Sequence, residues 1–418
     1  MFDSRAQGAI GEITFQRILR GEIMKSMNRR EFVIGSLSSF GSLIALTGRA
    51  DAALSAVLPV EAEAAANALA YNVAVLGDTH YDTEPDSVYH AHYDDSNIHS
   101  KVQRSEFRRN GEMWRERCPR LLASSANLAR QNKTDFILQL GDIIQGDCDH
   151  VPTHKKMLDD CIKMLKKPYS GDMPFLTVVG NHDFRGKGAR KAYFDFAHPF
   201  MTAEIEKLTG EKLKKPLNYP ILSFRKGPDL WILCDFERAM LNKVCNIIDN
   251  DPTARHVFIV THGPFTTYAN TKSYRWRLGG GTRALKSRQR LFDTLSKRRG
   301  IVLSGHTHST TYYRFENSLG SFCEFTGNSV WTGKSPVDAT PKNSTPEEYV
   351  PAERFLKMIR NKDDYYSEIN FFKPSLKEYY ETRAAGHYRL KVSENSVEME
   401  FYPCDAIVPG RVFKLKEV

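Results

Sequence analysis

The sequence predicts an α/β fold on three observations. Short apolar runs repeatedly end in glycine and then in acidic or imidazole side chains. Stretches with helical spacing separate several of these runs, which gives a strand, helix, strand order. Beyond Gly305 the apolar segments become shorter and include a hairpin pattern, which predicts a second, more antiparallel sheet. With 418 residues, 41% apolar and 26% charged, the chain has the composition of a globular protein.

The first 52 residues are predicted to be an export signal with an N-terminal extension. From Met27 the chain has the arginine pair Arg29 and Arg30, an apolar stretch over 32–46 and small residues near position 50. This order resembles a twin-arginine signal, which implies transient contact with the twin-arginine export machinery and an exported, periplasmic protein. The alternative is an amphipathic N-terminal helix. Residues 53–70 are predicted to be an alanine-rich linker, and 71–418 the folded domain.

Five apolar runs predict the strands that position the chemistry, and each stops at a polar, metal-capable or acid/base side chain. They are Val73–Leu76, Phe136–Leu140, Phe175–Val179, Val257–Val260 and Ile301–Leu303. In open α/β sheets, ligands bind at the carboxyl ends of the strands. We therefore expect these polar side chains to meet at one edge of the fold.

The remaining segments are assigned by periodicity. Helices are predicted over 118–131 and 154–166, and long loops over 81–112 and 265–290. A strand is predicted over 320–325, and a hairpin over 387–402 in which Tyr388, Leu390 and Val392 face Val397, Met399 and Phe401. Residues 336–378 are predicted to be an insertion with one helix.

The side chains that follow the five strands form a ligand set for metal ions. Carboxylate, imidazole and amide oxygen suit borderline or hard cations, and the absence of thiolate argues against a structural zinc cage. There are enough of these groups for two ions if one carboxylate is shared. Mn, Fe and Zn all suit such ligands. The residues are Asp78, His80, Asp142, Asn181, His182, His262, His306 and His308.

These blocks, D-x-H, G-D, G-N-H-D, H and G-H-x-H in order along residues 78–308, resemble the calcineurin-like metallophosphoesterase superfamily. The resemblance implies two packed mixed β-sheets flanked by helices, an α/β/β/α sandwich. It also implies that Asp78, His80 and His308 hold one ion, that Asn181, His262 and His306 hold the other, and that Asp142 bridges them.

The activity that the resemblance implies is hydrolysis of phosphomonoesters or phosphodiesters by a metal-bridging hydroxide. A bound metal lowers the pKa of water, and two ions can clamp a phosphoryl group. His182 would assist the leaving group, with Asp183 beside it to orient or charge its ring. Two alternatives stay open: a hydrolase of nucleotide diphosphate or pyrophosphate bonds, and a noncatalytic metal-binding scaffold.

Several basic and aromatic residues are candidates for contact with a phosphorylated small-molecule substrate, a nucleotide being one option. They are Arg185, Arg275, Trp276 and Arg277, although a solvated basic loop would show the same pattern at Arg185. The net charge of +9 favours anionic ligands, but the basic residues are spread along the chain. No stable nucleic-acid or membrane partner is therefore predicted.

Overall fold

The computed structural model describes residues 69–83, 89–90, 98–213, 220–266, 276–279, 285–330 and 362–417. These residues belong to one compact unit that spans 66–418. Strand β1 (Leu69–Leu76) begins two residues before the predicted start of the domain. The predicted export signal and residues 53–68 of the predicted linker lie outside the described residues.

In the part of the chain that the structure describes, the strands form two sheets. The first has six strands in the order β13-β12-β11-β1-β2-β3, with bounds Arg411–Glu417, Ser396–Pro403, Gly386–Ser393, Leu69–Leu76, Phe136–Gln139 and Phe175–Thr177. The second has seven strands in the order β10-β8-β9-β7-β6-β5-β4, with bounds Leu376–Thr382, Thr310–Asn317, Gly320–Thr326, Ile301–Ser304, Val257–Thr261, Asp229–Cys234 and Ile221–Lys226.

Both sheets are mixed. In the first, β1, β2 and β3 run parallel while β11 pairs antiparallel with β1. In the second, β5, β6, β7 and β9 run parallel, and β4, β8 and β10 are antiparallel to their neighbours. The prediction that the strands beyond Gly305 form a second, more antiparallel sheet is wrong, because β8 to β10 extend one sheet and β11 to β13 extend the other. The predicted hairpin register is confirmed: Tyr388 pairs with Phe401, and Leu390 with Met399.

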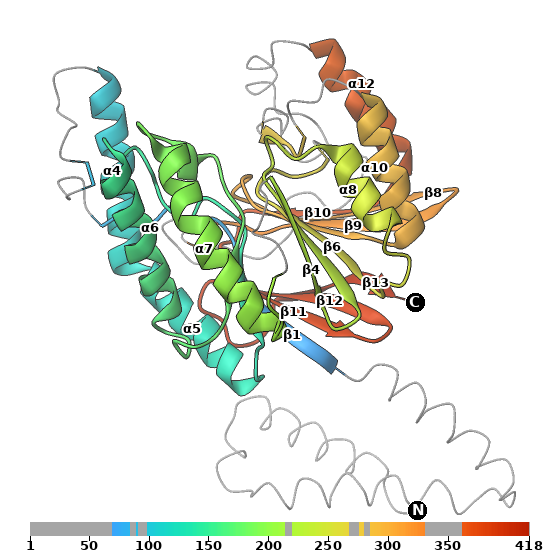
Figure 1. The fold of residues 1–418 in the computed structure, drawn as a ribbon, viewed down its shortest axis with the longest axis horizontal. Coiled ribbons are helices and arrows are strands. Elements are labelled where there is room, and N and C mark those ends of the chain that lie inside the picture. Colours follow the sequence, from blue (N-terminus) through green and yellow to red (C-terminus); the bar gives the residue numbers. More distant parts are fainter. Residues whose placement is uncertain are drawn as a thin grey trace, which may run out of the picture. The chain divides into compact units, whose positions relative to one another are not determined.

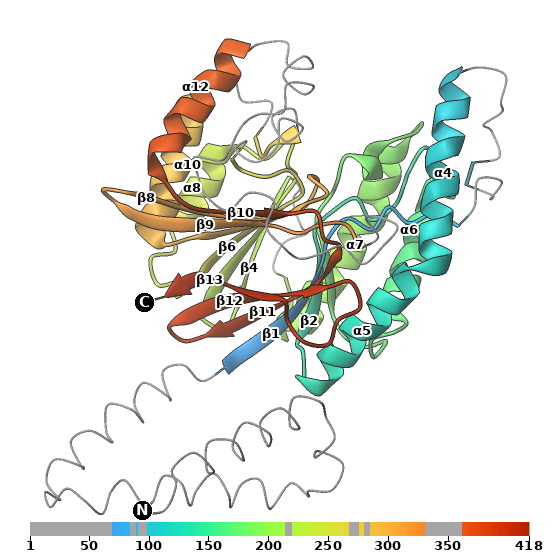
Figure 2. The same ribbon diagram turned by 180° about the vertical axis from the view of Figure 1, so that it is seen from behind.

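Helices cover the outer faces of the two sheets (Figures 1 and 2). Helices α5 (Cys118–Gln131), α6 (Val151–Lys166) and α7 (Ala189–Thr209) share a buried apolar cluster with the first sheet. Helices α8 (Leu241–Asp249), α10 (Leu285–Arg298) and α12 (Lys362–Phe372) do so with the second. The predicted α/β/β/α sandwich is confirmed.

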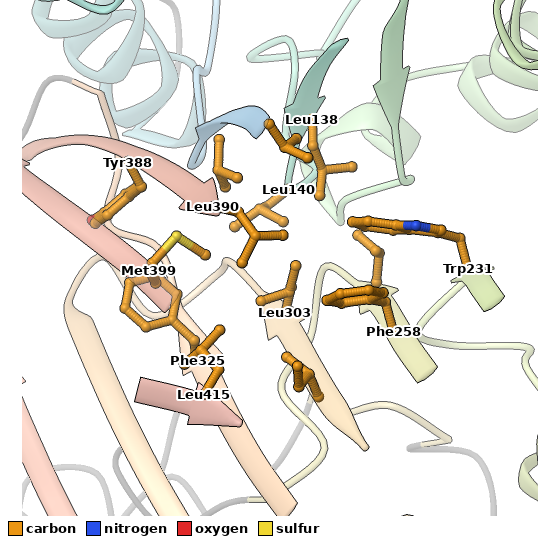
Figure 3. Close-up of a cluster of buried hydrophobic side chains, with 14 of the residues drawn as sticks. Leu138, Leu140, Trp231, Phe258, Leu303, Phe325, Tyr388, Leu390, Met399 and Leu415 are labelled. Carbon is orange, nitrogen blue, oxygen red and sulfur yellow. The ribbon is translucent and has the colours of Figure 1, made fainter. Parts of the chain in front are cut away.

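A third apolar cluster fills the space between the sheets (Figure 3). Leu138 and Leu390 of the first sheet contribute to it together with Leu303 of the second, and all three are fully buried. The Trp231 and Phe258 rings stack with centroids 4.2 Å apart. Burial of each such side chain contributes about 1.5–3 kcal/mol, so this layer holds the two strand edges that carry the site in a fixed relation.

Helix α5 is confirmed at its predicted bounds, and α6 begins three residues earlier than predicted. The loop predicted over 81–112 is wrong, because α4 (Ile98–Glu116) occupies much of it. The loop predicted over 265–290 also contains the start of α10. Of the predicted insertion over 336–378, residues 336–361 lie outside the described part of the chain. The rest consists of α12, the short 3-10 helix η3 (Lys373–Ser375) and the first residues of β10. No helix among the described residues is long and apolar enough to cross a membrane.

Candidate metal centre

The candidate ligands come together from both sheets. Asp78 follows β1, Asp142 follows β2 and Asn181 follows β3, all in the first sheet. His262 follows β6, and the segment that carries His306 and His308 follows β7, in the second sheet. Because the strands within each of these groups are parallel, their carboxyl ends meet at one edge of the sandwich.

The first set of candidate ligands consists of Asp78, His80 and His308. One ligand atom of each residue lies within 4.8 Å of those of the other two. The His308 Nε2 atom lies 3.2 Å from Asp78 Oδ2 and 3.1 Å from His80 Nε2. The His80 Nε2 atom lies 3.8 Å from Asp78 Oδ2. These are the three residues expected to hold the first ion.

A second set surrounds His262. Its Nε2 atom lies 3.1 Å from Asp142 Oδ2, 3.2 Å from Asn181 Oδ1 and 3.3 Å from His306 Nδ1. Asp142 also approaches the first set, since the same Oδ2 atom lies 3.7 Å from His80 Nε2. Its other oxygen accepts a 2.7 Å hydrogen bond from the backbone N–H of His182. Asp142 therefore stands between the two sets, as a bridging ligand must.

The hydrogen bonding of His262 shows that this site suits a cation. Its Nδ1 donates to the carbonyl oxygen of Leu140 at 2.9 Å, so in the neutral ring Nε2 carries a lone pair. That lone pair faces the oxygens of Asp142 and Asn181 and a nitrogen of His306. Electron-rich atoms in such contact require a proton or a metal ion between them. The nitrogen and oxygen donors suit Mn, Fe or Zn.

The pKa directions agree with that conclusion. Burial lowers the pKa of the His262 imidazole, but the carboxylates of Asp142 and Asp78 outweigh burial and raise it to about 9. Burial raises the pKa of Asp142, but the neighbouring histidines, His262 first, hold it well below its usual range. Without a metal, a proton on His262 compensates the carboxylates; a cation in the site would replace it.

Four of the candidate ligands have backbone conformations that L-residues rarely adopt. The φ angles are 41° at His80, 50° at Asp142, 71° at His306 and 53° at His308. Such residues cost roughly 1–3 kcal/mol each and cluster at functional sites. Backbone hydrogen bonds from Thr79 and His80 to the Asp142 carbonyl, at 3.0 and 2.8 Å, help to hold two of the strand-end turns together.

Two glycines allow the ligands to approach the backbone. A Cβ atom on Gly180 would lie 2.1 Å from both the backbone nitrogen and Oδ1 of Asp142. A Cβ atom on Gly305 would lie 2.4 Å from Asp78 Oδ1. The glycine that begins each of the G-N-H-D and G-H-x-H blocks is thus required by the close packing of a carboxylate against it.

The two candidate catalytic residues, His182 and Asp183, contact different groups. His182 borders the first ligand set, with its ring centroid 4.3 Å from that of His80 and its Nδ1 3.2 Å from the Gln145 carbonyl oxygen. The Asp183 carboxylate instead accepts hydrogen bonds from the backbone N–H groups of Gly180 at 2.8 Å and Ile144 at 3.2 Å. Asp183 therefore holds the strand-end loops. It was predicted to orient or charge the His182 ring, but the hydrogen-bond partners of that ring are Gln145 and Arg185. Burial, followed by the charge of Asp142, raises the pKa of Asp183 to about 8.

Arg185 lies against His182. One guanidinium nitrogen is 2.9 Å from Nδ1 and 3.1 Å from Nε2 of that ring. Its other terminal nitrogen forms ion pairs with Asp147 at 2.5 Å and with Glu106 of α4 at 3.2 Å. Burial first, then the charges of His80 and Arg185, hold the pKa of His182 well below its usual range. Arg185 thus borders the site, with its charge balanced by two carboxylates.

The other three substrate-binding candidates differ in their positions. The Trp276 ring lies beside the second ligand set, with its centroid 6.3 Å from that of His306. Arg277 is buried, and its Nε atom forms an ion pair with Glu368 of α12 at 3.1 Å. Arg275 lies outside the described residues.

Sequence reasoning missed two contributors to the site. Phe236 packs its ring 5.7 Å from that of His262, and it follows β5, whose apolar run ends at Asp235 as the other site strands end at polar residues. Helix α4 supplies Asn110, which donates to the Gln145 side chain at 2.6 Å. The position of Phe236 could have been recognised from the sequence, because it follows an apolar run that ends at a polar residue. The role of Asn110 could not, because it depends on Gln145, which is 35 residues away in the chain.

The fold and the site define an α/β/β/α protein with a candidate centre for two cations. Residues 71–310, more than half of the chain, match the calcineurin-like phosphoesterase family, and the chain belongs to that family. This confirms the superfamily that the sequence motifs indicated, and the family supports a hydrolase. None of the curated proteins compared with the chain matches it.

Solved structures that are similar to this chain include three from different organisms. GAP50, the anchor in the inner membrane complex of Plasmodium, is 14% identical, with a TM-score of 0.44 and coverage of 83% of this chain and 89% of that chain. A dimetal phosphatase from Danio rerio is 11% identical, with a TM-score of 0.45 and coverage of 84% and 100%. Purple acid phosphatase PPD1 from yellow lupin (Lupinus luteus) is 9% identical, with a TM-score of 0.46 and coverage of 83% and 53%.

Proposed function

We propose that this protein hydrolyses phosphoester bonds with two divalent or trivalent cations. The observation that supports this most directly is the position of Asp142 Oδ2, 3.1 Å from His262 and 3.7 Å from His80. One carboxylate oxygen thus reaches both ligand sets. A noncatalytic scaffold would not need His182 at the border of this centre.

Seven side chains would hold the cations. One set is Asp78, His80 and His308, the other is Asn181, His262 and His306, and Asp142 joins them. Cations bound there lower the pKa of water and neutralise phosphoryl oxygens. Asp142 keeps its place because its Oδ1 is held by the His182 backbone N–H.

His182 is proposed to assist the leaving group as a neutral ring. The neutral ring carries one proton, and its contacts accommodate that proton on either nitrogen: the Gln145 carbonyl oxygen only accepts and faces Nδ1 at 3.2 Å, whereas Arg185 only donates and lies 2.9 Å from Nδ1 and 3.1 Å from Nε2. In the tautomer with the proton on Nε2, the Nε2–H donates to the leaving-group oxygen as negative charge develops on it. A neutral imidazole can fill such an electrophilic role where its surroundings lower its pKa.

The test is turnover of p-nitrophenyl phosphate, its bis-ester and a nucleotide diphosphate compound by the purified protein with Mn²⁺. We expect metal-stimulated hydrolysis of at least one, and its absence on all three contradicts the proposal. His182→Ala should lower kcat by about 10²- to 10⁴-fold while elemental analysis still finds two ions per chain. Asp142→Ala should lose both turnover and metal, which separates the ligand role from the proton role.

We also propose that the protein acts after export, most simply in the periplasm. The support is the sequence of residues 27–52, with its arginine pair, apolar stretch and small residues. A signal of this kind is read by the twin-arginine machinery.

A further inference from the structure

The segment that follows β6 carries Trp276 and is fixed at both of its described ends. Residues 267–275 of this segment lie outside the described residues. Phe265 and Thr266 precede them, and residues 276–279 follow them. The two ends contact each other: the backbone N–H of Leu278 donates to the Pro264 carbonyl at 2.9 Å. A Cβ atom on Gly263 would lie 1.6 Å from the Trp276 carbonyl oxygen, so these backbones touch.

Buried charged groups from β9 and α10 hold this pair of backbone segments. Glu324 of β9 is fully buried and accepts hydrogen bonds from the backbone N–H groups of Phe265 at 2.6 Å and Thr266 at 3.0 Å. Arg288 of α10 donates to the carbonyl of Leu278 at 2.7 Å and to that of Phe265. The two side chains thus satisfy backbone groups on both sides of the segment.

Helix α12 completes the arrangement through Glu368, which is 3% exposed. Its carboxylate pairs with Arg277 Nε at 3.1 Å and with Arg288 Nε at 2.8 Å. Arg277 is the neighbour of Trp276 in the chain. Removal of the Glu368 charge would leave two buried guanidinium groups beside each other without this counter-ion, which buried charges do not tolerate well.

The consequence is a tryptophan fixed at the edge of the metal centre. The partly exposed Trp276 ring meets Phe236 and His306 edge to face, with centroids 6.0 and 6.3 Å away. Phe236 in turn packs against His262. An aromatic wall therefore borders the second ligand set. On the side of the first set, His182 is bordered by the charged Arg185, which in turn binds Gln103 and Glu106.

We propose that Trp276 determines specificity by contacting a planar aromatic group of the substrate, an aryl or nucleobase moiety attached to the phosphoryl group, and that Glu368 is a positioning residue that acts on Trp276 through Arg277. The inference rests on the proposed phosphoesterase function. Stacking of a base or aryl ring on an aromatic side chain contributes about 5- to 150-fold in affinity. A ring fixed in advance loses little conformational entropy on binding, so it can provide most of that factor.

The first experiment compares phenyl phosphate with ethyl phosphate, or the matching diesters if the wild type prefers diesters. Trp276→Ala should lower the ratio of kcat/KM for the phenyl ester to kcat/KM for the ethyl ester roughly 5- to 150-fold. Trp276→Phe should recover most of the loss. Titration calorimetry with phenylphosphonate and methylphosphonate should show the same selectivity in binding. Equal losses for both esters, or no loss, overturn the proposal.

The second experiment tests the positioning role. Glu368→Gln should reduce the preference for phenyl over ethyl esters, mainly through KM, and should leave the metal content unchanged. The control is Glu378→Gln, which removes an exposed ion pair and should leave both the preference and the metal content unchanged. In the Trp276→Ala background, Glu368→Gln should have no further effect on that preference. Additive effects refute a route through Trp276. If the wild type turns over no ester and binds neither phosphonate, the phosphoesterase function itself fails, which is a different result from lost selectivity.

Discussion

Substitution of Gly180 by alanine provides the sharpest test of the proposed bridging carboxylate. The added Cβ would lie 2.1 Å from both the backbone nitrogen and Oδ1 of Asp142, whereas ordinary contacts begin at 3.4 Å. The shortfall is 1.3 Å. Rotation of the Asp142 side chain cannot remove it, because the backbone nitrogen is equally close. The backbones at Gly180 and Asp142 must therefore move apart, which changes the position of Asp142 relative to Asn181.

A displacement of about 1 Å in a catalytic group can lower the rate by about 10²-fold. We therefore expect Gly180→Ala to lower kcat about 100-fold and to bind fewer than two ions per chain. The assay is steady-state turnover together with elemental analysis of the purified variant, with circular dichroism to establish that the fold persists. Gly171→Ala is the control, because nothing lies within 4 Å of a Cβ at that position. A folded Gly180→Ala protein with two bound ions and wild-type kcat would refute the bridging geometry.

The remaining predictions concern pH, the core and export. Burial lowers the pKa of His154 from 6.5 to about 4, so between those pH values the unfolded chain binds a proton that the folded chain does not. The free energy of unfolding should therefore fall by about 3 kcal/mol from this residue as the pH drops from 6.5 to 4, and urea titrations of His154→Gln should show a smaller fall than the wild type. Leu303→Ala, in the layer between the sheets, should lose about 2–5 kcal/mol in the same assay, whereas the exposed Leu319→Ala should lose less than about 0.5 kcal/mol. Replacement of Arg29 and Arg30 by lysine should block export of a reporter fused to residues 1–70, and continued export of that fusion would contradict the twin-arginine proposal.

The strands that carry the candidate ligands could be predicted because their signals are local. Each is a short apolar run rich in Val, Ile, Leu and Phe, and each stops at a polar residue within a few positions of the observed strand end. Parallel strands place such ends at one edge, so the meeting of Asp78, Asp142 and His262 also followed from the pattern. The hairpin register followed from alternation across a short turn.

The features that could not be predicted from the sequence depend on contacts between residues that are far apart in the chain. Helix α4 has a narrow buried face in which Asn110 replaces an apolar residue and binds Gln145, so its periodicity is weak. The C-terminal strands could not be assigned to sheets, because β11 joins the first sheet by pairing with β1, more than 300 residues earlier. The ion pair of Arg277 could not be predicted for the same reason, since its counter-ion Glu368 lies far along the chain.

Each proposed cation would be held by residues of both sheets: Asp78 and His80 with His308, and Asp142 and Asn181 with His262 and His306. The ions would then work as cross-links between the two halves of the sandwich. A ligand at 100 times its dissociation constant stabilises the native state by about 2.7 kcal/mol. Two sites so loaded would contribute about 5 kcal/mol, comparable to the whole stability of many small domains. Depletion of metal by a chelator would thus weaken the protein as a structure as well as an enzyme.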